Sequence, residues 1–132
     1  MRKPIPCVIP PRRDYRPIPA MVTQLPFVYG PRNLRYHGRL SGSLWYVPHT
    51  GNDAKAQTIG REYAAHFAQY LKDNPDQIGG NLLGRIVLDM HNPNTAGNIG
   101  YRTGFFTYLE KLIAMQAAQC DVFVELDQFN RG

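Results

Sequence analysis

Proline placement is the strongest constraint on how this chain can fold. Eight of its eleven prolines fall within residues 1–33. Proline fixes the backbone φ angle and has no amide donor, so a segment this rich in proline forms neither a helix nor a central strand. The expected conformation is an extended, polyproline-like arm. Residues 34–132 are then expected to fold as a single domain.

Charge divides the chain at nearly the same place. Residues 1–40 carry eight basic residues and one acidic residue, a net charge of +7. Residues 41–132 carry seven basic and nine acidic residues, a net charge of −2. A basic arm on a slightly acidic body favours an anionic partner, which is either nucleic acid or an acidic protein surface.

The arm also interleaves arginines with tyrosines. Guanidinium groups bind phosphates, and aromatic rings stack on bases. The candidate residues for binding nucleic acid or a partner are Arg2, Lys3, Arg12, Arg13, Tyr15, Arg16, Arg32, Arg35, Tyr36 and Arg39. In a second interpretation, apolar arm residues such as Ile5 and Ile18 pack on a neighbouring protein while the arginines stay in water. Either way, the chain is expected to belong to an oligomer or a larger complex.

Two elements are predicted directly after the arm. Apolar segments flank Ser41-Gly42-Ser43, so residues 34–48 are predicted to form a β-hairpin, with Trp45 as a core or interface anchor. A helix is then predicted from about Ala54 to about Lys72, followed by Asn74-Pro75 as its stop signal. Its apolar stripe consists of Ile59, Tyr63, Phe67, Tyr70 and Leu71.

The stretch from Gly84 to Asp127 is predicted to form a βαβ unit. Residues 84–91 (GRIVLDMH) and 121–128 (DVFVELDQ) are short apolar runs with β-branched residues, which favour strands. Between them, apolar residues recur at helical spacing and predict a helix from near Thr95 to near Gln119. The predicted fold class is therefore α/β, with α+β as the alternative, in the order hairpin, helix, strand, helix, strand.

Both predicted strands end in polar, mostly acidic residues. Side chains two residues apart on a strand share a face, and ligands of open α/β sheets bind at the carboxyl ends of the strands. Three carboxylates and one imidazole would suit Mg²⁺ or Mn²⁺ and phosphodiester hydrolysis. The simpler interpretation is a polar strand edge that faces water, so neither a metal nor a catalytic residue is assigned. The cluster consists of Asp89, His91, Glu125 and Asp127.

The segment NPNTAGNIGYRTG (residues 92–104) offers a second candidate site at the start of the predicted helix. Free amides at a helix N-terminus, together with Arg102, could hold a phosphate. The glycine spacing matches neither G-x-G-x-x-G nor the P-loop pattern. Gly100 and Gly104 lie one helical turn apart and more simply allow the helix to approach the sheet closely.

Several function classes lack a signature in this sequence. There is no GxSxG, no CxxC and no apolar run long enough to span a membrane. The prolines that follow Arg2 and Lys3 interrupt the apolar stretch that a signal peptide would need. The expected location is the cytoplasm or a particle assembled there, with no cofactor and no membrane contact.

These features favour a non-enzymatic binding or assembly protein whose arm docks on nucleic acid or an acidic protein surface. Two alternatives stay open at this point. One is a small structural or inhibitory protein of a virus or mobile element that grips a partner protein, which fits the size of the chain and its arm. The other is a divalent-metal nuclease that uses the acidic cluster.

Overall fold

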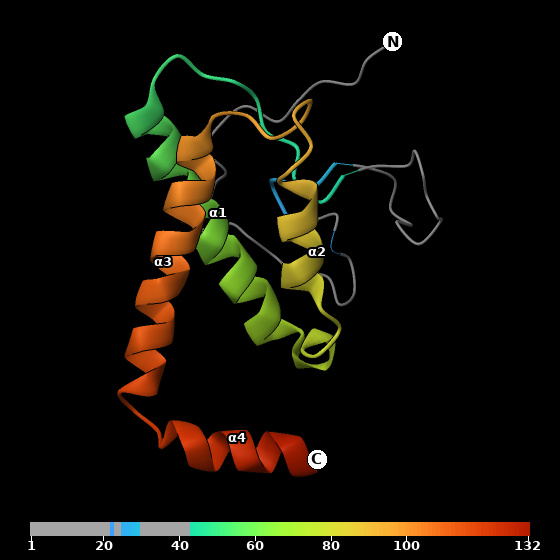
Figure 1. The fold of residues 1–132 in the computed structure, drawn as a ribbon, viewed down its shortest axis with the longest axis vertical. Coiled ribbons are helices and arrows are strands. Elements are labelled where there is room, and N and C mark those ends of the chain that lie inside the picture. The colour runs from blue at the N-terminus through green and yellow to red at the C-terminus, as the bar shows by residue number, and fades with distance from the viewer. Residues whose placement is uncertain (1–21, 23–24, 30–42) are drawn as a thin grey trace.

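The computed structural model describes residues 22, 25–29 and 43–132, and this part of the chain is helical. Its elements are α1 (Asp53–Asp73), the short 3₁₀ helix η3 (Pro75–Gln77), α2 (Leu82–Asp89), α3 (Ile99–Ala117) and α4 (Val122–Arg131) (Figure 1). The described residues contain no strand and no sheet, and their only β-type pairing is one antiparallel bridge between Tyr29 and Ser43. The predicted α/β class is therefore wrong, and so is its α+β alternative.

The first strand of the predicted βαβ unit, residues 84–91, lies mostly in α2. Leu82, Ile86 and Met90 are spaced four residues apart, and all three are buried. This spacing places them on one side of a helix, facing the core. The apolar, β-branched run at 86–88 suggested a strand, but burial of the helical stripe decides the structure.

The second predicted strand, residues 121–128, begins α4 instead. Asp121 is the N-cap residue, and its Oδ1 accepts hydrogen bonds from the backbone amides of Phe123 and Val124, each at 3.1 Å. Such a cap satisfies amides that the first helical turn leaves without partners. Glu125 in the first turn and Arg131 in the last turn also suit the helix dipole.

The predicted hairpin over residues 34–48 is not formed where the structure describes it. Residues 34–42 lie outside the described part, and residues 45–50 have no regular secondary structure. Ser43 pairs instead with Tyr29 through two backbone hydrogen bonds of 2.7 and 2.9 Å, and the Tyr46 amide donates to the Phe27 carbonyl at 2.9 Å. The segment from Ser43 to Val47 therefore runs beside residues 27–29.

Both predicted helices are confirmed. α1 extends one residue beyond the predicted range at each end, and its N-cap Asn52 accepts a hydrogen bond from the Lys55 amide through its side chain at 3.1 Å. α3 begins at Ile99, four residues later than expected, and ends at Ala117.

α1 and α3 form the main helix–helix contact of the described chain (Figure 1). A Cβ atom added at Gly60 would collide with the carbonyl oxygen of Tyr101, and one added at Gly104 would collide with that of Gln57. The two backbones therefore touch, which requires residues without side chains at these positions. The close approach predicted from Gly100 and Gly104 is confirmed, but the helix that they approach is α1 and not a sheet.

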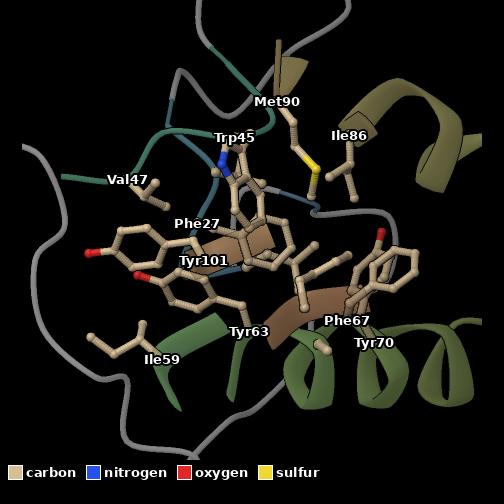
Figure 2. Packing of buried hydrophobic residues seen from close by; sticks show 14 of the residues in the cluster. Phe27, Trp45, Val47, Ile59, Tyr63, Phe67, Tyr70, Ile86, Met90 and Tyr101 are labelled. Carbon is tan, nitrogen blue, oxygen red and sulfur yellow. The ribbon is translucent and has the colours of Figure 1, made fainter. Parts of the chain in front are cut away.

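Aromatic rings from several segments fill the space beside this helix pair (Figure 2). Trp45 is fully buried, and its ring centroid lies 5.3 Å from that of Phe27 and 5.3 Å from that of Phe105. Its Nε1 donates a hydrogen bond of 3.2 Å to the carbonyl of Ala96. The prediction that Trp45 is an anchor is confirmed, and its place is in the core.

The core also takes in Leu25, Phe27 and Val28. These residues belong to the segment 1–33, which the proline pattern assigned to the arm. Core residues therefore come from both sides of the boundary predicted between residues 33 and 34.

Tyr70 of α1 lies in a site that disfavours its ionised form. The side chain is fully buried, and its hydroxyl has no hydrogen-bond partner in the part of the chain that the structure describes. Burial, and to a smaller extent the negative charge of Asp76, raises the pKa of the Tyr70 phenol above its usual 10.0.

Tyr70→Phe should leave the free energy of unfolding unchanged near neutral pH or raise it by about 1 kcal/mol, because it removes a buried hydroxyl without a partner. The folded state holds the phenolic proton more tightly than the unfolded state. The stability linked to this proton is therefore complete below about pH 10 and is lost as the pH rises through the folded pKa. Urea unfolding at several alkaline pH values should show a steeper loss for the wild type than for Tyr70→Phe. Equal slopes would refute the raised pKa.

Candidate functional site

The strands that were to assemble the acidic cluster are absent from the described structure. Asp89 ends α2, and its Oδ2 accepts a hydrogen bond of 2.7 Å from the backbone amide of Leu44. The Nδ1 of His91 lies 3.1 Å from the carbonyl oxygen of Val87, one turn earlier in the same segment. Asp89 thus fixes the loop before α1 and does not face a ligand site.

Glu125 and Asp127 lie on α4 and are exposed. In Figure 1, α4 (red) lies at the bottom of the view, and the C-terminal end of α2 lies in its upper half. No group of three or more His, Cys, Asp or Glu side chains among the described residues could hold a metal ion. The described structure therefore does not bring the four residues of the predicted cluster together.

The predicted phosphate site at the start of α3 is filled by a side chain of the protein. The amide of Gly100 donates a hydrogen bond of 3.1 Å to Oδ1 of Asp53, the first residue of α1. This carboxylate takes the position that an anion would need at the helix N-terminus. The Asn98 side chain reinforces the link with two hydrogen bonds of 2.7 Å to the backbone of Thr50. The segment therefore joins the start of α3 to the start of α1.

The ten predicted binding residues of the arm all lie outside the described residues, so their role stays a prediction. They are Arg2, Lys3, Arg12, Arg13, Tyr15, Arg16, Arg32, Arg35, Tyr36 and Arg39.

Exposed apolar surface is concentrated on α4. Five of the eleven exposed large hydrophobic residues of the described chain belong to this ten-residue helix. None of its side chains is buried against the described part of the molecule. Figure 1 shows why: α4 turns away from the end of α3 and lies apart from α1 and α2. The helix is therefore open to contact with another molecule.

Four of the five exposed apolar residues of α4 gather on one side, and the fifth, Val124, lies on the opposite side. Phe123, Leu126 and Phe129 follow one another at intervals of three, and Val122 precedes Leu126 by four. Residues at these intervals are neighbours on a helix surface. We call Val122, Phe123, Leu126 and Phe129 the α4 face. Its two phenylalanines are 74% and 69% exposed, far more than an aromatic side chain in a core.

The C-terminal end of α3, which leads to α4, also exposes apolar side chains to solvent. Ile113 and Met115 are exposed, whereas Tyr101 and Phe105 at the other end of the same helix are buried. Exposed apolar side chains therefore also occur in the last two turns of α3, next to α4 in the sequence.

The α4 face was missed because residues 121–128 were assigned to a strand, which places Phe123 and Leu126 on opposite sides. The signals that identify it are present in the sequence: the N-cap residue Asp121, and the three-residue spacing that runs on to Phe129.

Comparison of the chain with protein families, curated proteins and solved structures finds no match. None of the described helices combines the length and apolar character that crossing a membrane requires.

Proposed function

We propose that this protein is a non-enzymatic binding or assembly protein. In this proposal α4 is a protein-contact helix, and the basic arm docks on an anionic partner. The observation that carries the proposal is the exposed α4 face, in a helix with no side chain buried against the described part of the chain.

The physical chemistry of short helices supports a contact role for α4. Isolated helices shorter than about 12–15 residues are marginal in water, and most helices in proteins depend on packing of an apolar face. Capping by Asp121 and the favourable charges at both ends stabilise α4 by about 1–2 kcal/mol in total. Covering two phenylalanines contributes more, since each fully buried phenylalanine is worth about 1.5–3 kcal/mol.

The charge of the arm supports the second part of the proposal. Eight basic residues stand against one acidic residue in positions 1–40, while the rest of the chain is slightly acidic. Positive charge concentrated in one segment is the usual electrostatic basis for binding a polyanion. Nucleic acid is the partner that we test first, because arginines and tyrosines alternate in the arm.

Binding to a short DNA duplex, measured by fluorescence anisotropy over a range of salt concentrations, tests the arm. The triple variant Arg12→Ala, Arg13→Ala, Arg16→Ala should bind more weakly, and its salt slope should fall by about three units, because three phosphate contacts are lost. The matched control is Lys55→Ala, Arg61→Ala, Lys72→Ala, which removes the same charge from exposed positions of α1. This control should change the slope much less.

Two results would contradict the docking of the arm on nucleic acid. One is binding that does not depend on salt. The other is an equal loss of slope in both triple variants, because net charge and not the arm would then drive the association.

A further inference from the structure

We propose that the partner of the α4 face is a second copy of this chain, with the two α4 helices packed antiparallel about Leu126. This inference rests on one part of the proposed function, the contact role of α4, and is independent of the arm.

The α4 face has the same pattern in both directions. Phe123 lies three residues before Leu126, and Phe129 lies three residues after it. In an antiparallel pair related by a twofold axis at Leu126, each Phe123 meets Phe129 of the second copy, and the two leucines meet each other. A surface that is complementary to itself under a twofold rotation is what a symmetric dimer requires.

The charges at the two ends of α4 agree with this arrangement. Asp121 lies five residues before Leu126, and Arg131 lies five residues after it. At 3.6 residues per turn both lie about 140° around the helix from Leu126, outside the α4 face. Antiparallel pairing therefore brings helix ends of opposite charge to the same level without a direct contact between these two side chains. Parallel pairing would place like charges together at both ends, which is unfavourable.

This symmetry is the reason for choosing a second copy over an unrelated protein. A different protein could cover the apolar residues equally well, but it would not require phenylalanines at equal distances on both sides of Leu126. Val122 and Asn130, four residues away on either side, differ in polarity. The self-complementary contact is therefore centred on Phe123, Leu126 and Phe129.

The exposed apolar area of α4 suffices for a dimer interface at the small end of the size range of specific interfaces. A fully covered phenylalanine buries about 150–250 Å², so the four phenylalanines of a pair, each about seven-tenths exposed, supply roughly 600 Å². Val122 and Leu126 of both copies bring the total close to the roughly 1,000 Å² of a specific interface. The dimer is therefore expected to dissociate on dilution.

Cysteine cross-linking of the full chain tests the geometry, in a background with Cys7→Ser and Cys120→Ser. Leu126→Cys should form a disulfide between two copies, because it lies on the twofold axis. Phe123→Cys and Phe129→Cys should form few cross-links separately and many when the two variants are mixed. Leu88→Cys is the matched control, since Leu88 is 69% exposed on α2. Rapid cross-linking of Phe123→Cys alone would indicate parallel helices and overturn the proposal.

Sedimentation equilibrium tests the energetics. Phe129→Asp should raise the dissociation constant of the dimer by at least about thirtyfold, because two central contacts are lost in each pair. Its melting temperature, extrapolated to low concentration, should match that of the wild type. Leu88→Asp should leave the dissociation constant unchanged.

A wild-type protein that is monomeric at all accessible concentrations, or equal effects of the two aspartate variants, would overturn the pairing. DNA binding by the arm is measured on the same samples. A monomer that still binds DNA in the salt-dependent manner expected of the arm refutes the pairing alone. If the wild type shows no salt-dependent binding to DNA, that result contradicts the proposed function of the arm.

Discussion

Gly104→Ala should destabilise the protein by at least about 3 kcal/mol, at the upper end of the cost of overpacking. The added Cβ would collide with the backbone carbonyl of Gln57, and a carbonyl cannot rotate away as a flexible side chain can. α1 and α3 would have to separate, which would loosen the aromatic core beside them. In thermal denaturation followed by circular dichroism, the melting temperature should fall by more than about 10 °C.

Gly51→Ala is the matched control for this variant. Gly51 lies before α1, and a Cβ added there would have no atom within 4 Å. Its melting temperature should stay within a degree or two of the wild-type value, because small surface changes rarely exceed about 0.5 kcal/mol. A wild-type melting temperature for Gly104→Ala would show that the two helix backbones are not in contact.

Trp45→Ala should reduce the free energy of unfolding by about 3–5 kcal/mol, the usual cost of emptying a large aromatic site. Trp45 is fully buried between Phe27 and Phe105, and its Nε1 satisfies the carbonyl of Ala96. Trp45→Phe keeps part of the ring packing but loses the hydrogen bond and some volume. Trp45→Phe should therefore reduce the free energy of unfolding by less, about 1–3 kcal/mol. Urea unfolding measures both variants.

Phe123→Ala provides the comparison, because it removes an aromatic ring that is 74% exposed. At concentrations where the protein is monomeric, its free energy of unfolding should equal that of the wild type. If Trp45→Ala were as mild as Phe123→Ala, the core would not be organised around the indole ring.

The long helices could be predicted from the sequence because their signals agree with one another. In α1, the apolar residues Ile59, Tyr63 and Phe67 repeat at helical spacing, the cap residue Asn52 precedes the helix, and Pro75 follows it. The length of the pattern adds to the reliability, since an apolar stripe of more than three turns, from Ile59 to Leu71, has no strand interpretation.

The short helix α2 could not be predicted by the same rules. Ile86 and Val87 favour a strand locally, and the helical spacing from Leu82 through Ile86 to Met90 shows only when the window is extended past Gly84. The N-cap of α2 gives no help, because Asn81 adopts a left-handed conformation with φ of 62° and makes no capping hydrogen bond through its side chain. Tertiary burial decided the outcome over local propensity.

The candidate site changed with the secondary structure. Asp89 and Glu125 seemed to converge only because two strands were expected side by side, and the structure places one against Leu44 and the other on an exposed helix. Once residues 122–131 are helical, the α4 face follows directly from the spacing of Phe123, Leu126 and Phe129. Its exposure does not follow from the sequence, since it depends on where α4 lies relative to α3.

Amide hydrogen exchange of α4 at several protein concentrations most directly tests whether a second copy covers this helix. A solvated helix of ten residues should exchange almost without protection. We expect the protection of α4 to rise with concentration in the wild type and to stay low in Phe129→Asp, while the protection of α1 and α3 stays constant in both. Protection of α4 that is the same at every concentration, or unaffected by Phe129→Asp, would contradict the account.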